Sequence, residues 1–144
     1  MQIDETDRTL IALLQENARM PVTKLAKRLD LARTTVQARL DRLEQSGIIQ
    51  GYAVRLNQNM RAPLRATVLL AIEPRSAPAV LAKLDTHSNV MAVYTTSGRF
   101  DMIVELEAQT TEDLDKTLDQ IGETKGVKSS ESLIHLSTRI NRHR

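Results

Sequence analysis

The stretch VTKLAKRLDLARTTVQARLDRLEQSG, residues 22–47, decides how the first part of this chain folds. Its apolar residues repeat at helical spacing in two runs, Leu25, Ala26 and Leu29, then Val36, Leu40 and Leu43. Residues 30–32 between the runs leave room only for a turn, and Gly47 suits the end of the second helix because glycine tolerates a left-handed backbone. Two helices joined by so short a turn predict a helix-turn-helix, whose second helix can enter the major groove of DNA.

The outward face of the second predicted helix carries side chains that suit DNA. Hydroxyl and amide groups can contact base edges, and arginines can hold phosphates. The candidate DNA-binding residues are Arg33, Thr34, Thr35, Gln37, Ala38, Arg39 and Arg42. A helical hairpin with a solvated outer face fits the same pattern, because Asp41 and Glu44 dilute the positive charge. Spacing therefore favours DNA binding without deciding it.

Composition limits the class of protein. The 144 residues allow one domain or two small ones, and 41% hydrophobic residues can form a packed core. A net charge of +2 gives no strongly polycationic surface, and the absence of cysteine excludes disulfides, cysteine nucleophiles and zinc fingers. The acidic, amphipathic start is unlike a signal peptide, and no apolar run approaches the roughly 18 residues that span a membrane. We therefore expect a cytoplasmic protein.

The segments around the central stretch complete a first domain. Acidic residues and spaced leucines predict a helix over residues 4–15, and Pro21 suits the first turn of the next helix. The alternating, β-branched residues 48–56 predict a strand or small wing. Residues 57–63 have the composition of a linker. We expect residues 1–60 to form a winged helix-turn-helix DNA-binding domain with its wing and linker.

The second half of the chain changes to the period of strands. Strands are predicted over residues 66–73, 90–96 and 100–107, with a last strand within 127–140. Helices are predicted from Pro78 through Leu84 and from Thr110 to near Gly122. The order βαββαβ predicts a ferredoxin-like domain over residues 61–144, and the whole chain is then an α+β protein.

Both faces of the first predicted strand are apolar. Val68, Leu70 and Ile72 alternate with Leu69 and Ala71. Helices cover only one face of such a sheet, so the other face is expected to meet a second copy of the chain. This pattern predicts a homodimer.

Four runs of sequence, in this order, resemble the leucine-responsive/asparagine (Lrp/AsnC, or feast/famine) family of transcriptional regulators. They are IDETDRTLIALLQENARM, LAKRLDLARTTVQARLDRLEQSGIIQGY, TTSGRFDMIVELEA and IGETKGVKSSESLIHLS. The resemblance covers nearly the whole chain. It implies a winged helix-turn-helix that binds double-stranded DNA and a ferredoxin-like domain for amino-acid sensing and oligomerisation. It also implies dimers, which in this family often stack into octamers.

Three residues depart from the pattern of that family. Asp30 stands where the family usually has glycine, and Ala32 replaces a serine helix cap, which costs about 1 kcal/mol unless Thr34 substitutes. Ala38 replaces a common arginine on the groove-facing side, so readout there is expected to be apolar, for instance against a thymine methyl. The operator sequence of the family is therefore not carried over to this chain.

The candidate effector site lies around Gly98-Arg99-Phe100-Asp101, which matches the family's G-x-[YF]-D motif. Gly98 permits a sharp turn whose uncovered amides suit a carboxylate, and Asp101 can pair with an ammonium group. Ser130 and Ser132, together with Ser129, are expected to line the same cleft. A glycine turn capped by an aspartate, beside a polar edge strand, is the alternative interpretation.

Catalytic residues, metal ligands and a cofactor are not expected. His87, His135 and His143 share no metal-ligand spacing, and Asp101 and Glu105 have no nucleophile or metal partner nearby in the sequence. Siroheme decarboxylases of tetrapyrrole biosynthesis also resemble this family, and His87, His135 and Arg99 keep that enzyme class open. A sequence-indifferent, DNA-compacting protein is a third possibility, which predicts similar affinity for a promoter and for random DNA.

Overall fold

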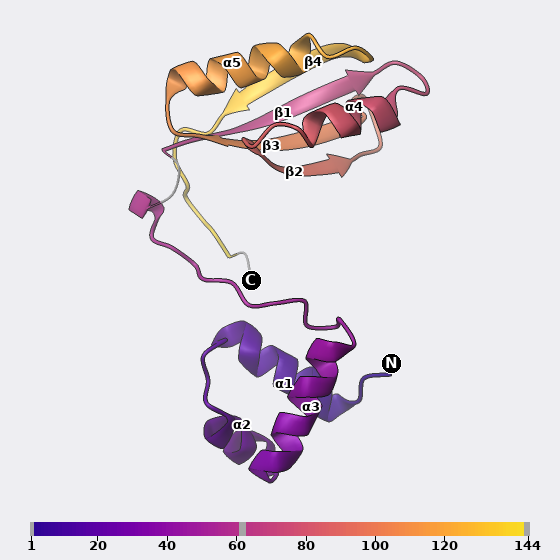
Figure 1. Cartoon of the computed structure of the whole chain (residues 1–144). Coiled ribbons are helices and arrows are strands. Elements are labelled where there is room, and N and C mark those ends of the chain that lie inside the picture. The colour runs from indigo at the N-terminus through magenta and orange to yellow at the C-terminus, as the bar shows by residue number, and fades with distance from the viewer. Residues whose placement is uncertain (1, 61–62, 143–144) are drawn as a thin grey trace. The chain divides into compact units, whose positions relative to one another are not determined.

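The computed structural model of the chain describes residues 2–60 and 63–142, and it consists of two compact units (Figure 1). The first unit contains three helices, α1 (Glu5–Glu16), α2 (Val22–Leu29) and α3 (Arg33–Gln45). The second contains a short 3-10 helix η1 (Gln58–Met60), two α-helices and four strands. The predicted order of helix-turn-helix followed by βαββαβ is confirmed. No helix among the described residues is long and apolar enough to cross a membrane.

The three helices of the first unit pack around a small aliphatic core. The fully buried side chains come from all three helices and are Leu10, Leu25, Val36 and Leu43. Asp30 ends α2 with a left-handed backbone (φ 53°), the conformation that its glycine-like position requires. Ala32 stands at the N-cap of α3, and no side chain hydrogen-bonds there, so Thr34 does not replace the missing serine cap.

The strand or wing expected over residues 48–56 is wrong. Residues 50–57 have no regular secondary structure, and the Ile49 N–H donates instead to the Leu43 carbonyl at 3.0 Å. Alternating residues form a strand only beside another strand that satisfies their backbone groups, and the described part of the first unit contains none. The apolar side chains of Tyr52, Val54 and Leu56 remain exposed as a result.

The linker expected over residues 57–63 is only partly described. It begins with η1, whereas residues 61 and 62 lie outside the described residues.

The second unit is a four-stranded antiparallel sheet in the order β2-β3-β1-β4. Its elements along the chain are β1 (Leu64–Ile72), α4 (Ala77–Leu84), β2 (Val90–Thr95), β3 (Met102–Ala108), α5 (Thr111–Gly122) and β4 (Val127–Ile134). This order places β4 and β3 on either side of β1. The end of β1, the turn before β3 and the start of β4 therefore lie close together at one end of the sheet.

The two faces of the sheet differ in cover. Alternate residues of β1 and β3 are buried with Val80 and Leu84 of α4 and with Leu114 and Ile121 of α5, so both helices lie on the same face (Figure 1). On the opposite face, Tyr94, Ile103 and Leu69 are paired neighbours across β2, β3 and β1. No helix of the described second unit covers this row, and all three side chains remain partly or largely exposed.

Candidate DNA-binding and effector-binding sites

The predicted base-reading residues lie on the outer surface of α3. Thr34, Thr35, Gln37 and Ala38 are all exposed, because Val36 and Leu43 turn the opposite side of the helix into the core. Gln37 Nε2 donates to Asp41 Oδ1 at 2.8 Å, which orients the amide along the helix. Arg33 begins α3 and makes no ion pair with any described residue. The hydroxyl, amide and guanidinium groups of these residues form a small polar surface on the outer side of α3.

Arg39 and Arg42, on the same helix, are paired with carboxylates at the start of α1. Arg39 Nη1 lies 2.8 Å from Asp4 Oδ2 and 2.9 Å from Asp7 Oδ1. Arg42 Nη2 lies 3.0 Å from Asp7 Oδ2. Sequence reasoning gave these acids only a role at the helix N-terminus and missed the pairs, since 32 to 35 residues separate the partners.

The same carboxylates also cap α1. Asp4 accepts from the Asp7 N–H at 2.8 Å, and Asp7 accepts from the Asp4 N–H at 3.2 Å, which makes a reciprocal capping box. The side-chain hydrogen bond from Arg39 is the main cause that lowers the pKa of Asp4 to about 2, followed by the backbone hydrogen bond from Asp7. The two acids also raise the pKa of the Arg39 guanidinium. Asp4 and Arg39 therefore stay charged over the physiological pH range.

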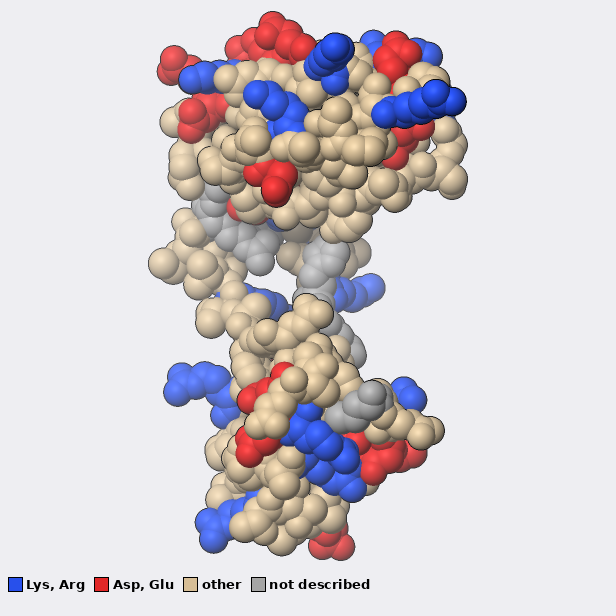
Figure 2. Space-filling view, turned by 45° about the vertical axis from the view of Figure 1, so that its right-hand side comes forward, with Lys and Arg blue, Asp and Glu red and all other residues tan. Residues whose placement is uncertain are grey.

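Both units carry charges of both signs on the face shown in Figure 2. Figure 2 shows Lys and Arg side chains interspersed with Asp and Glu, with no extended patch of a single sign on the face in view. This agrees with the net charge of +2. Recognition of DNA by such a surface depends on individual placed groups more than on a general positive field.

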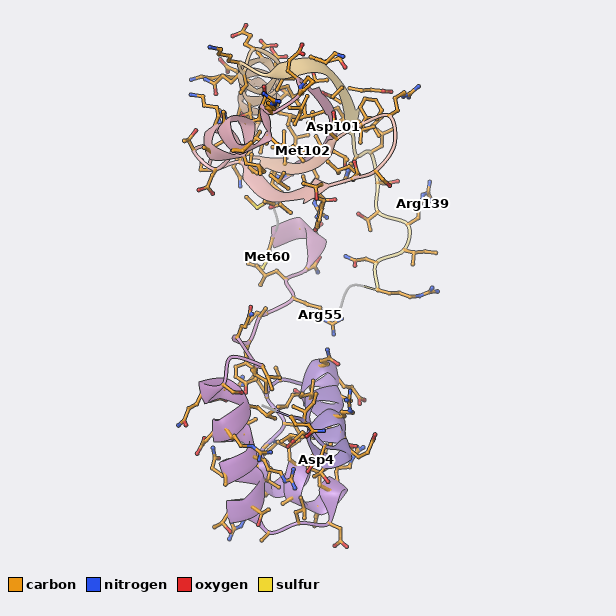
Figure 3. The ribbon with its side chains drawn as sticks, turned by 90° about the vertical axis from the view of Figure 1, so that its right-hand side faces the viewer. Asp4, Arg55, Met60, Asp101, Met102 and Arg139 are labelled. Atoms are coloured by element: carbon orange, nitrogen blue, oxygen red, sulfur yellow. The ribbon has the colours of Figure 1, made fainter. Side chains whose placement is uncertain are left out.

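The predicted effector loop is a tight turn between β2 and β3. Gly98 has a φ of 113°, and the turn is closed by Thr96, whose N–H donates to the Asp101 carbonyl at 3.0 Å and whose hydroxyl donates to the Phe100 carbonyl at 2.9 Å. Asp101, labelled beside Met102 in Figure 3, joins this turn to β1. Its N–H donates to the Leu70 carbonyl at 2.7 Å, and its Oδ2 accepts from the Ile72 N–H at 2.8 Å.

A shallow pocket adjoins the turn at the end of β1. It is lined by Ala71, Arg99, Phe100, Lys128, Ser129, Ser130 and Glu131. Arg99 lies over the Phe100 ring, 5.0 Å from its centre, and Arg99 Nη2 is 4.0 Å from Glu131 Oε2.

The pocket brings together only part of the predicted effector set. Arg99, Phe100 and Ser130 line it, whereas Gly98, Asp101 and Ser132 do not. The lining residues Lys128 and Glu131 were not predicted. They flank Ser129 and Ser130 on β4. Their place in the pocket follows from the pairing of β4 with the end of β1, which the sequence alone does not give.

The three residues that kept a tetrapyrrole enzyme possible, His87, His135 and Arg99, do not lie together. His87 lines a different pocket, with residues of α4 and α5, and its Nε2 is buried without a described partner. His135 Nε2 lies 2.8 Å from Thr67 Oγ1, at hydrogen-bond distance. Arg99 belongs to the pocket beside Phe100, so the structure assembles no common site from the three.

Two protein-family models match the chain. The AsnC-type helix-turn-helix domain matches residues 3–44, and the Lrp/AsnC ligand binding domain matches residues 65–144. Among relatives, the HTH-type transcriptional regulator FL11 of Pyrococcus abyssi is 30% identical over 139 residues, which are 96% of this chain and 92% of FL11. The HTH-type transcriptional regulator LysM of Sulfurisphaera tokodaii is 29% identical over 135 residues, 93% of this chain and 95% of LysM.

Solved structures share the fold over almost the full length. AsnC of E. coli gives a TM-score of 0.88 at 24% identity, covering 100% of this chain and 99% of AsnC. A transcriptional regulator of Neisseria meningitidis in complex with L-Met gives a TM-score of 0.86 at 23% identity, covering 97% of this chain and 94% of that protein.

Acid is expected to destabilise the first unit through Asp4. Its pKa is about 2 in the folded protein against an ordinary value of 3.8, so its contribution to stability is complete above about pH 4 and is lost as the pH falls towards 2. Asp4→Asn should remove this part of the pH dependence and lower stability at neutral pH. Urea unfolding followed by circular dichroism across this range measures it, with Glu5→Gln, one residue along and without an arginine partner, as the control. Equal acid dependence in Asp4→Asn and the unsubstituted protein would contradict the assignment.

Proposed function

Since the chain belongs to the Lrp/AsnC family of transcriptional regulators, we propose that it binds DNA sequence-specifically and that an amino acid controls its DNA binding or assembly. The family consists of regulators and not enzymes, which sets aside the tetrapyrrole-enzyme alternative. The observation that carries the proposal is the polar outer surface of α3, presented by a helix whose other side is locked in a core. A regulator of this kind acts on DNA in the cytoplasm.

The proposed DNA interface divides α3 into two kinds of contact. Thr34, Thr35 and Gln37 read base edges, and Ala38 offers a methyl group to thymine. The three arginines Arg33, Arg39 and Arg42 contact phosphates. In support of this division, Arg33 has no described ion-pair partner, and Arg42 is half-exposed despite its bond to Asp7. In a dimer, two such helices would enter half-sites about one helical turn apart, or a multiple of that distance.

Arg33→Ala tests the phosphate contact. It should weaken binding to all DNA sequences similarly and reduce the slope of log affinity against log salt by about 1. Lys116→Ala, which removes one exposed positive charge from α5 in the other unit, is the control and should leave the slope unchanged. Fluorescence anisotropy on an operator selected from random DNA, and on a scrambled copy, measures both quantities. Equal affinity for the two DNAs at matched salt would favour the DNA-compacting alternative instead.

We also propose a homodimer, which can stack further into an octamer, formed through the uncovered face of the sheet. Tyr94, Ile103 and Leu69 form a continuous apolar row there. Apolar surface of this kind is stabilised by burial against a partner, and a second copy carries the complementary surface by symmetry.

A charge at the centre of this face should dissociate the assembly. In sedimentation velocity at micromolar concentration, the full chain should run as a dimer or larger, and Ile103→Glu should run as a monomer. Leu81→Glu, at a partly exposed apolar position on α4, is the control and should not change the assembly. A monomeric unsubstituted chain, or a dimeric Ile103→Glu variant, would contradict the proposal.

The proposed effector is an amino acid bound at the turn of residues 98–101 and the adjoining pocket, in a cleft completed by a neighbouring subunit. Backbone N–H groups around Gly98 would donate hydrogen bonds to its carboxylate, and Asp101 would face its ammonium group. Ser130 and Ser132 on β4, with Arg99 and Phe100, would contact the rest of the molecule. Asp101 Oδ2 accepts a hydrogen bond from the Ile72 N–H. Its other carboxylate oxygen has no described partner, so it can accept a hydrogen bond from a ligand.

Asp101→Asn is expected to weaken effector binding and leave ligand-free DNA affinity intact. The amide oxygen can still accept from the Ile72 N–H, so the turn is kept while the charge is removed. A thermal-shift screen of the twenty amino acids identifies the effector, because a ligand that binds only the folded state raises its melting temperature.

Calorimetry measures the effector affinity of the variant, and a DNA-binding assay on the same preparation measures its DNA affinity. The effector should change the free energy of DNA binding by about 1–3 kcal/mol. Asp115→Asn on α5 is the matched control. If Asp101→Asn binds the effector as tightly as the unsubstituted protein, Asp101 only caps the turn and does not bind the effector.

A further inference from the structure

The carboxylate of Asp7 is buried and binds two arginines of the proposed recognition helix. Its side chain is 0% exposed, its Oδ1 lies 2.9 Å from Arg39 Nη1, and its Oδ2 lies 3.0 Å from Arg42 Nη2. Asp4 completes the cluster from the surface and binds Arg39 through both oxygens. Figure 3 labels Asp4 in the helical unit. The start of α1 is therefore tied to two successive turns of α3.

Stability alone does not account for this arrangement. A carboxylate loses its hydration when it is buried, and its pairing with a cation often only balances that loss. The capping bond from the Asp4 N–H to Asp7 stabilises the start of α1, but it does not require the bond between Asp7 and Arg42. We therefore ask what the bonds from Asp7 do to the position of the two arginines.

The two arginines are held in different ways. Arg39 is mostly covered and is bound by both Asp4 and Asp7, so, beside its proposed phosphate contact, it joins α3 firmly to the start of α1. Arg42 has half of its side chain exposed and is bound at one nitrogen only. A guanidinium has five N–H donors, so Arg42 keeps donors for a further acceptor while Asp7 restrains its side chain.

Arg42 also shares a side of α3 with a residue of the proposed base-reading surface. It follows Thr35 by seven residues on α3, which places both on the same side of the helix. Thr35 belongs to the proposed base-reading surface. A restrained guanidinium at the margin of that surface can bind a phosphate without first losing the freedom of a long side chain.

We propose that Asp7 is a positioning residue for DNA recognition, which holds the Arg42 guanidinium ready for a phosphate at the edge of the major groove. This inference rests on the proposed function. It also predicts an effect opposite to that of simple charge. Removal of a negative charge near DNA should tighten binding through the general field, whereas loss of positioning should weaken it.

Asp7→Asn in the full chain separates these two effects. It should weaken binding to the selected operator by roughly three- to tenfold, the range expected for ordering one long side chain. Glu5→Gln removes the same charge from the same turn of α1 without touching an arginine, and it should bind DNA as tightly as the unsubstituted protein or more tightly. Thermal unfolding of both variants confirms that they are folded at the temperature of the binding assay.

A double-mutant cycle identifies the residue through which Asp7 acts. In the Arg42→Ala background, Asp7→Asn should cause no further loss of affinity, whereas in the Arg33→Ala background it should cause its full loss. A merely structural role of Asp7 would give the same loss in both backgrounds and would overturn the proposal.

Arg42→Lys keeps the test decisive if Asp7→Asn does not fold. Lysine keeps the charge, but its single nitrogen cannot hold Asp7 and a phosphate in the way that a planar guanidinium can. This variant should fold normally and lose affinity by a similar factor, and affinity equal to the unsubstituted protein would overturn the proposal. If the unsubstituted protein itself does not prefer the operator to scrambled DNA, the proposed function fails. If it does, and Asp7→Asn binds like Glu5→Gln, only the present inference fails.

Discussion

The α-helices and the central strands β1 and β3 of this small protein each bury one apolar face, and the opposite faces are what remain for function. In the first unit, Leu10, Leu25, Val36 and Leu43 commit one side of each helix to the core. The outer side of α3 is thereby presented to solvent with its hydroxyl, amide and guanidinium groups. In the second unit, both helices pack on one side of the sheet, which leaves the row of Tyr94, Ile103 and Leu69 uncovered. The two proposed interaction surfaces are thus by-products of how the cores form.

Within each unit, one carboxylate then fixes the position of groups beside the proposed binding surface. Asp7 binds two arginines of α3 from within the first unit, and Asp101 hydrogen-bonds the end of β1 in the second. Each carboxylate joins segments that are distant in the chain, and each stands beside a proposed binding surface. One acid would restrain a group that contacts DNA, and the other would itself contact an effector. A regulator needs both surfaces, because an effector can alter DNA affinity only through structure that the two sites share.

The chain's departures from its family's sequence pattern have local structural explanations. Asp30 adopts the left-handed backbone that ends α2, which a short polar side chain tolerates. Ala32 leaves the N-cap of α3 without a side-chain hydrogen bond, and the helix is held by its packing instead. The uncapped helix start lies next to Arg33 and Thr34, so its free amides add to the donors on the proposed DNA-binding surface.

Periodicity alone determined the helix-turn-helix, the βαββαβ order and the uncovered sheet face, because apolar spacing is a local property that survives from sequence to fold. The turn at Gly98 was also predictable, since its backbone needs a left-handed residue there. The strand expected over residues 48–56 was wrong, because a strand depends on a neighbour that sequence cannot supply. The pairing of Arg39 and Arg42 with Asp4 and Asp7, and the union of Arg99, Phe100, Lys128 and Ser130 in one pocket, were decided only by the tertiary structure. Such contacts join residues roughly 30 positions apart, and their distances follow from helix and strand packing that no local pattern encodes.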